Sequence, residues 1–165
     1  MRAPAGQRWR SSLLALTLAF TIGCDQMSKG IAARRLADGG AAEALGGAIR
    51  FQLADNRGAF LGMGDRLPEG ARVGLLVVLV GVGLGAGAAF LFRDRRRRLA
   101  AALGLALVLG GGIGNLVDRV VRGTVTDFAV IGIGPLRTGV FNGADAAIVA
   151  GAVLAAGASV RARRE

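Results

Sequence analysis

The chain has 165 residues, of which 53% are apolar, 5% aromatic and 28 are glycine, and this length allows one domain. It contains no His and one Cys, which excludes Ser-His-Asp and Cys-His catalysis, an imidazole metal site, an intramolecular disulfide and a cysteine cluster. A formal net charge of +10 suggests a nucleic-acid or anionic partner in a soluble protein, but the mean hydropathy of +0.51 is high for one. The positions of the excess charges therefore decide the class of protein.

Four runs that are almost free of charge predict membrane-spanning helices. A helix needs about 20 residues, at a rise of about 1.5 Å each, to cross a hydrocarbon core of about 30 Å. Two runs reach this length without a charged residue, and a third carries only Asp145. The first run is too short unless its helix continues through Asp25 and Lys29. Within a single domain over residues 1–165, the predicted spans are about 11–33, 73–92, 99–117 and 143–160.

The basic residues gather at three places that flank these spans. Three precede the first span, five lie between the second and third, and three follow the fourth. With Asp94 and Glu165 included, these clusters hold +9 of the +10. If four helices alternate in direction, all three clusters fall on one side, which is the positive-inside pattern and predicts two cytoplasmic termini. The clustered residues are Arg2, Arg8, Arg10, Arg93, Arg95, Arg96, Arg97, Arg98, Arg161, Arg163 and Arg164.

The N-terminus has a second interpretation. Arginines, an apolar stretch and the sequence Thr21–Cys24 resemble a signal peptide that is cleaved before a lipidated cysteine. Thr21 is a poor residue at its place in such a cleavage site, and three further spans follow. We therefore prefer a helix that is retained in the membrane.

Two segments, about residues 34–72 and 119–142, lie on the side away from the basic clusters. In the first, apolar residues alternate with polar ones and predict a strand over Ala48–Ala54, bounded by glycine turns. In the second, β-prone residues are interrupted by glycines and a proline, and we place Asp127 in a loop there. The predicted fold is mainly α, a polytopic membrane protein with four transmembrane helices and a small extracytoplasmic β-element.

The polar residues inside spans or at span ends are the most informative ones in a membrane chain. Taken singly, each has a structural explanation. Asp25 and Lys29 have the spacing of a helical ion pair, Asp118 fits the water interface, Asp127 fits an exposed turn, and Asp145 fits a helix start. By alternating topology, however, all of them fall near the extracytoplasmic end. The set is Asp25, Ser28, Lys29, Asn115, Asp118, Arg119, Asp127, Asn142 and Asp145.

Hydrolytic chemistry without His must rest on carboxylates, Ser28, Lys29 or Cys24. Ser28 and Lys29 are consecutive and point to different helix faces, which argues against a Ser-Lys dyad. Two aspartates in one site can share a proton, so that one activates a water and the other protonates the carbonyl oxygen. Asp127 and Asp145 come from different elements and are the predicted pair. Ion or proton transport and a non-catalytic assembly role are the alternatives, although no polar path leads to the arginine side.

Five short motifs occupy the extracytoplasmic ends of the spans. In chain order they are Asp25–Lys29 (DQMSK), Asn56–Phe60 (NRGAF), Gly111–Arg119 (GGIGNLVDR), Val125–Phe128 (VTDF) and Phe141–Ile148 (FNGADAAI). Together they resemble the motifs of the signal peptidase II family, four-helix aspartic peptidases of the bacterial inner membrane. The second motif has one small residue before Phe60 where two are commoner, which puts the placement of Asn56 in question. A divergent paralogue with a narrower substrate set is therefore an alternative.

The resemblance implies an activity and a set of site residues. Family members cleave diacylglyceryl-modified prolipoproteins just before the lipidated cysteine, with no metal or cofactor. The implied partners are these substrates and membrane lipid, with no nucleic acid, and we expect a monomer. The family's catalytic aspartates fall on Asp127 and Asp145, at the extracytoplasmic face, and the strand at 48–54 belongs to a β-cradle on the membrane. The supporting residues, which orient the pair or engage substrate, fall on Asp25, Lys29, Asn56, Asn115, Asp118, Arg119 and Asn142.

Overall fold

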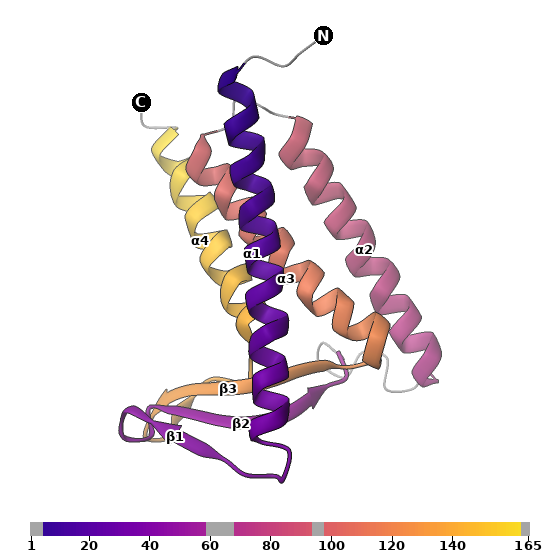
Figure 1. The fold of residues 1–165 in the computed structure, drawn as a ribbon, viewed down its shortest axis with the longest axis vertical. Coiled ribbons are helices and arrows are strands. Elements are labelled where there is room, and N and C mark those ends of the chain that lie inside the picture. Colours follow the sequence, from indigo (N-terminus) through magenta and orange to yellow (C-terminus); the bar gives the residue numbers. More distant parts are fainter. Residues whose placement is uncertain (1–4, 59–67, 94–97, 163–165) are drawn as a thin grey trace.

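The computed structural model describes residues 5–58, 68–93 and 98–162 as a bundle of long helices with a small antiparallel sheet at one end (Figure 1). The helices are α1 (Ala5–Arg35), α2 (Glu69–Arg93), α3 (Leu99–Arg122) and α4 (Gly143–Ala162). The start of α1, the end of α4 and the α2 and α3 ends that flank residues 94–97 all lie opposite the sheet. Successive helices therefore alternate in direction, as the sequence predicts.

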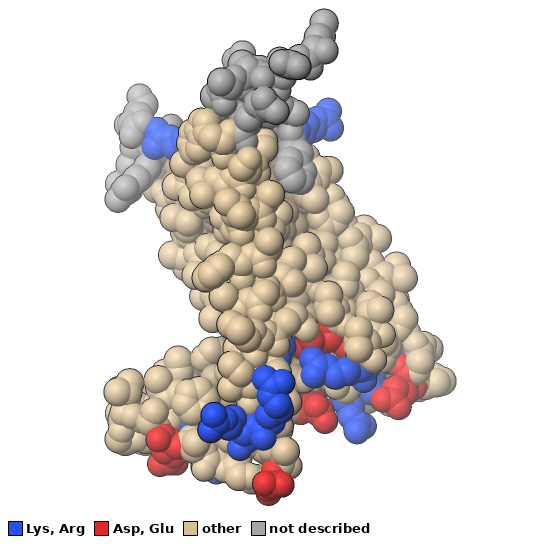
Figure 2. Space-filling model, in the orientation of Figure 1, with Lys and Arg blue, Asp and Glu red and all other residues tan. Residues whose placement is uncertain are grey.

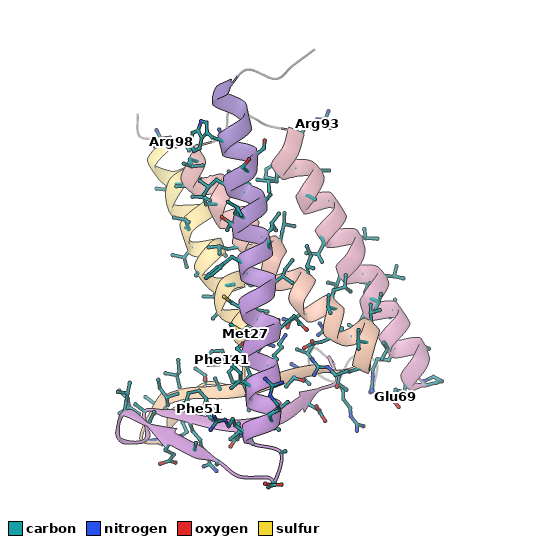
Figure 3. All side chains as sticks on the ribbon, viewed as in Figure 1. Met27, Phe51, Glu69, Arg93, Arg98 and Phe141 are labelled. Atoms are coloured by element: carbon teal, nitrogen blue, oxygen red, sulfur yellow. The ribbon has the colours of Figure 1, made fainter. Side chains whose placement is uncertain are left out.

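The basic end of the bundle is described only in part. Arg93 and Arg98 lie at the end opposite the sheet (Figure 3). Six other members of the three basic clusters fall outside the described residues. These are Arg2, Arg95, Arg96, Arg97, Arg163 and Arg164, together with the acidic Asp94 and Glu165.

Among the described helices, α2, α3 and α4 are long and apolar enough to cross a membrane. Helix α1 has 31 residues, about 46 Å at the usual rise, which is also long enough. Asp25 and Lys29 make it less apolar, but Leu16 and Phe20 on its surface are 66% and 74% exposed, as expected of side chains that face lipid. The protein is thus a mainly helical membrane protein with a small sheet. Helices α2, α3 and α4 qualify as membrane spans by length and composition. The assignment of α1 as the fourth span rests on its length and on its packing against α3 and α4.

Helix α3 is the centre of the bundle and packs against the other three helices. Small residues allow this close packing. A Cβ atom on Gly104 would lie 2.5 Å from the Gly151 carbonyl oxygen in α4, and one on Gly111 would collide with the Ala144 carbonyl. Helix α3 also continues beyond the predicted span 99–117 to Arg122 and is capped by Gly123, whose φ of 75° is left-handed. Its last polar turn is therefore helical and not part of the following loop.

The sheet has four strands in the order β1-β2-β3-β4, with antiparallel neighbours. A short 3-10 turn, Leu45–Gly47, joins the first two strands. The long central pair runs from Ile49 opposite Ile131 to Asn56 opposite Val125. The strands are β1 (Ala42–Ala44), β2 (Ile49–Asn56), β3 (Val125–Ile133) and β4 (Leu136–Arg137).

One predicted strand is confirmed and one predicted loop is wrong. The strand expected at Ala48–Ala54 is β2, displaced slightly toward the C-terminus. Asp127, expected in a loop, lies inside β3, because this strand pairs with β2 on both sides of a register shift between Phe51 and Ala54. From the sequence, Gly132 predicts an interruption of the strand, but the residue lies within β3. Its N–H donates to the Ala48 carbonyl at 2.9 Å, and a side chain there would collide with Leu136.

Candidate active site

Charged side chains gather where the helices meet the sheet. Figure 2 shows acidic and basic residues side by side at this end, whereas the middle of the bundle on the same face carries none. The polar residues predicted to converge come from α1, β2, α3, β3 and the start of α4. The structure brings them into one hydrogen-bonded network.

The centre of the network is a buried ionic triad of Asp25, Lys29 and Asp118. Lys29 Nζ lies 2.7 Å from Asp25 Oδ2 and 3.0 Å from Asp118 Oδ2, and all three side chains are at most 1% exposed. Buried charges of this kind are tolerated when each one has an opposite partner. The predicted ion pair between Asp25 and Lys29 is confirmed. The alternative that Asp118 marks the water interface is wrong, because its carboxylate is buried against the lysine.

The triad also fixes the ends of neighbouring elements. Asp25 Oδ1 accepts a hydrogen bond from the Ala144 N–H at the start of α4 (2.8 Å). Asp118 Oδ2 accepts one from the Thr126 N–H at the start of β3 (3.2 Å). Gly114 makes room for this arrangement, since a Cβ atom there would lie 2.5 Å from Asp25 Oδ2. The chain segments that carry Asp127 and Asp145 are therefore both anchored to the same ionic centre.

Asn115 links the triad to Asp145. Its Oδ1 accepts hydrogen bonds from Lys29 Nζ and from Asn142 Nδ2, each at 3.0 Å. Because an ammonium group only donates, the Asn115 atom that faces Lys29 must be the oxygen. The amide nitrogen is then directed at Asp145, and Asn115 Nδ2 donates to Asp145 Oδ1 at 2.9 Å.

Helix α4 begins with a reciprocal capping arrangement between Asn142 and Asp145. Asn142 Oδ1 accepts from the Asp145 N–H at 2.9 Å, and Asp145 Oδ2 accepts from the Asn142 N–H at 3.2 Å. This is the geometry of a capping box, and an acid in the first helical turn is also favoured by the helix dipole. The interpretation of Asp145 as a helix-start acid is confirmed. The same hydrogen bonds hold its carboxylate in a defined orientation.

Asp127 approaches the same asparagine from β3. Asn142 Nδ2 donates to Asp127 Oδ1 at 2.6 Å, and Asn56 Nδ2 donates to Asp127 Oδ2 at 2.9 Å. Asp127 is only 3% exposed, so its interpretation as an exposed turn acid is wrong. Burial is the main cause that raises the pKa of Asp127; the hydrogen bond from Asn56 opposes it, and the neighbouring Asp145 carboxylate adds to the rise.

Asn56 is placed by the turn that follows β2. Its Oδ1 accepts from the Gly58 N–H at 2.9 Å, and Gly58 has a φ of 75°, which favours glycine. A Cβ atom on Gly58 would lie 3.3 Å from the Arg119 Nε, so glycine also allows the guanidinium to approach. The shortened second motif thus leaves Asn56 in contact with Asp127. Residues 59–60 of that motif lie outside the described residues.

Two residues of the network were not predicted. Gln26 Nε2 donates to Asp25 Oδ2 at 3.2 Å and to Asp118 Oδ1 at 3.1 Å, so it bridges the two acids of the triad. Arg122 donates to Asp118 Oδ1. The sequence contains a signal for each. Arg122 follows Asp118 by one helical turn, and Gln26 lies between Asp25 and Lys29 in the first motif.

The other candidate nucleophiles, Ser28, Lys29 and Cys24, do not combine into a second catalytic group. Ser28 Oγ donates to the Asp25 carbonyl oxygen at 2.8 Å, while the Lys29 ammonium is held by the triad, so the two do not form a dyad. Cys24 is a free thiol. Over residues 5–58, 68–93 and 98–162, no group of three or more His, Cys, Asp and Glu side chains is placed to hold a metal ion.

The fold and the site define a class: a multi-pass membrane protein with an acidic, hydrogen-bonded site at one end of its helices. The sequence model of the Signal peptidase (SPase) II family matches residues 17–161. The chain therefore belongs to the signal peptidase II family, and the predicted family is confirmed.

Individual relatives and solved structures agree with this family. The chain is 51% identical over 47 residues to the lipoprotein signal peptidase of Beijerinckia indica subsp. indica and 53% identical over 47 residues to that of a Janthinobacterium species. Each match spans 28% of this chain and 28% of the relative. Two solved structures, both described as a bacterial membrane enzyme, match more of the fold. One has a TM-score of 0.78 and 25% identity over 91% of this chain and 88% of that chain. The other has a TM-score of 0.77 and 26% identity, covering 87% and 89%.

Proposed function

We propose that the protein is an intramembrane aspartic endopeptidase that removes signal peptides from diacylglyceryl-modified bacterial prolipoproteins. It cuts before the lipidated cysteine, and Asp127 and Asp145 are its catalytic pair. The observation that carries this proposal is that Asn142 hydrogen-bonds both carboxylates, one from β3 and one from α4. Family membership supports the substrate class.

The two carboxylates have complementary parts in the proposed reaction. Asp127, whose pKa burial raises, carries the proton at the start of the reaction, and Asp145 acts as the general base. Asp145 takes a proton from a water whose oxygen attacks the scissile carbonyl carbon, and Asp127 gives its proton to the carbonyl oxygen. In the second step the roles reverse. The tetrahedral intermediate loses that proton to Asp127, the peptide C–N bond breaks, and Asp145 protonates the leaving amine.

The other network residues position this pair or the substrate. Asn142 holds both carboxylates, and the triad of Asp25, Lys29 and Asp118 fixes the elements that carry them. Arg119 Nε is a buried donor without a hydrogen-bond partner among residues 5–58, 68–93 and 98–162, and we assign it to a carbonyl oxygen of the substrate. Asn56 borders the same site through Asp127.

The proposal also specifies where the enzyme lies, how it is oriented and what it binds. The enzyme lies in the bacterial cytoplasmic (inner) membrane as a single domain over residues 1–165, with both termini cytoplasmic and the site at the extracytoplasmic face. The positions of the basic clusters support this orientation. It works on lipid-modified prolipoproteins in contact with membrane lipid, as a monomer, without metal, cofactor or nucleic acid.

The test is cleavage of a lipidated precursor by purified protein in detergent or lipid. Asp127→Asn and Asp145→Asn should each reduce cleavage by at least about a hundredfold, the range of a lost general acid or base. Asp38→Asn, at an exposed aspartate that follows α1, is the matched control and should keep full activity. Thermal unfolding of each variant separates lost chemistry from lost fold. Full cleavage by either site variant would remove that residue from the catalytic pair.

A further inference from the structure

A groove of about 380 Å³ lies between the start of α3 and the end of α4. Arg98 and Ala100 line it from the α3 side, and four residues of α4 form the other wall: Val153, Leu154, Gly157 and Ala158. Arg98 carries the one charge among these described lining residues, and it lies at the end of the bundle opposite the sheet (Figure 3). The volume is within the range of about 300–1,000 Å³ that is usual for ligand pockets. None of the six residues belongs to the polar network of the proposed active site.

The groove extends from the headgroup level into the apolar part of the membrane. Helices α3 and α4 are both long and apolar enough to cross it. Helix α4 ends on the basic side, so Gly157 lies nearer that end and Val153, one turn earlier, lies about 6 Å deeper. Val153 is 68% exposed, and a Cβ atom on Gly157 would meet nothing within 4 Å, so this wall is open. A cation above an apolar channel complements a lipid with an anionic headgroup.

The charge of the adjoining segment favours an anionic lipid over a zwitterionic one. Residues 93–98 contain five arginines and one aspartate, a net charge of +4. Such a cluster attracts a headgroup whose phosphate is its only charge, and it repels the ammonium of a zwitterionic headgroup. A second copy of the chain is a poorer occupant. Two copies in the same orientation would bring two such basic segments to the same level of the membrane, where they repel each other.

We propose that the groove between α3 and α4 binds one anionic phospholipid, with its phosphate at the Arg98 guanidinium and an acyl chain along Gly157 and Val153. An arginine suits this position because its planar group donates paired hydrogen bonds to phosphate oxygens. The bound lipid would bridge the ends of two helices that pack against each other further along. The site is at the opposite end of the bundle from the sheet, and it stands or falls independently of the proposed peptidase activity.

The experiment measures lipid binding to the full chain in a neutral detergent by native mass spectrometry. Phosphatidylglycerol and phosphatidylcholine with identical acyl chains are titrated separately, and glycerol phosphate supplies the headgroup without the chains. Arg98→Gln removes the cation, and Gly157→Leu fills the groove. Arg93→Gln is the matched control for charge, because Arg93 is an exposed arginine of the same basic segment that does not line the groove. Gly85→Leu is the control for bulk, since Gly85 is an exposed helical glycine with equally open surroundings.

The wild type should bind phosphatidylglycerol about fivefold more tightly than phosphatidylcholine, the effect of one arginine on an anionic lipid. Arg98→Gln should remove this preference, Gly157→Leu should weaken the binding of both lipids at least about fivefold, and both controls should match the wild type. Equal affinities for the two lipids in the wild type, an equal loss in Arg93→Gln, or unchanged binding in Gly157→Leu would overturn the site. Displacement of the lipid by glycerol phosphate would indicate a site for soluble phosphates instead. A dimer that Gly157→Leu dissociates would assign the groove to a second copy, and either result would also overturn the proposal.

Discussion

The two halves of α3 are built on different principles. In the half near the basic end, Gly104, Ala106 and Leu109 are buried and pack closely against other helices. In the half near the sheet, Asn115 and Asp118 are buried but meet charged and amide groups. The first half holds the bundle together by contact between small residues. The second half uses buried polar groups, which are costly unless paired, to fix the positions of a few side chains.

The two halves of α3 therefore have different roles: one packs the helices together, and the other positions polar side chains. Near the basic end, the buried residues of α3 from Ala101 to Gly111 are all apolar or glycine, so the polar network is confined to the sheet end of this helix. The value of the network is in orientation, because each carboxylate of Asp127 and Asp145 accepts hydrogen bonds from groups that are themselves held. Substitutions in the two halves should therefore have separable effects on stability and on chemistry.

The largest effect on stability is expected from Lys29→Met. It leaves Asp25 and Asp118 buried without their shared cation, and breaking a buried ion pair in this way costs about 3–5 kcal/mol. Thermal unfolding in detergent measures the loss. A triple variant that also carries Asp25→Asn and Asp118→Asn removes the charges and should recover most of the stability, but not the activity, because Asn115 is no longer oriented by Lys29. Wild-type stability in Lys29→Met would contradict the central role of the triad.

A smaller loss is expected in the packed half of α3. Gly104→Ala places a methyl group against the Gly151 carbonyl, so α3 and α4 must separate, at a cost of about 1–3 kcal/mol. The pH profile of the remaining activity should not change. Gly83→Ala in α2 is the matched control, since a Cβ atom there meets nothing within 4 Å, and it should be neutral or slightly stabilising. Equal effects of the two substitutions on the free energy of unfolding would show that close packing at Gly104 does not contribute to stability.

Asn56→Ala tests the electrostatics of the pair. The Asn56 hydrogen bond favours the ionised form of Asp127, so its removal should raise the pKa of Asp127 further and move the alkaline limb of the kcat/KM profile to higher pH. The loss of one hydrogen bond, worth about 0.5–1.5 kcal/mol, should also lower activity by up to about tenfold. Arg57→Ala, at the exposed neighbouring position, should change neither. A shift of the limb to lower pH would contradict the assignment of the proton to Asp127.

The smallest expected effect is a pH dependence of folding. The native pKa of Asp127 is raised above the ordinary value of 3.8, so in the window between the two values the native state binds more protons than the unfolded state. Stability must then fall as pH rises through that window. The free energy of unfolding of the wild type, relative to Asp127→Asn, should decrease across it and be constant below it. A relative stability that increases with pH would reverse the sign of the shift.

The sequence predicted the elements of the site better than their connections. The spacing of Asp25 and Lys29 reveals an ion pair, and alternating topology places the polar residues at one end. The contact of Lys29 with Asp118 and the shared contacts of Asn142 join residues far apart in the chain, so no local pattern contains them. The incorrect prediction of a loop at Asp127 has the same cause. The strand that holds it depends on pairing with β2, about 70 residues earlier, and the glycines after it suggest a break.

The most direct test of the account is the double variant Asp127→Asn/Asp145→Asn, compared with each single variant in cleavage of a lipidated precursor. If the two carboxylates work as one unit that shares a proton, each single substitution already removes the chemistry, and residual cleavage by the double variant should equal that of the single variants. Losses that multiply in the double variant, or a single variant that keeps wild-type cleavage while folded, would contradict the central claim.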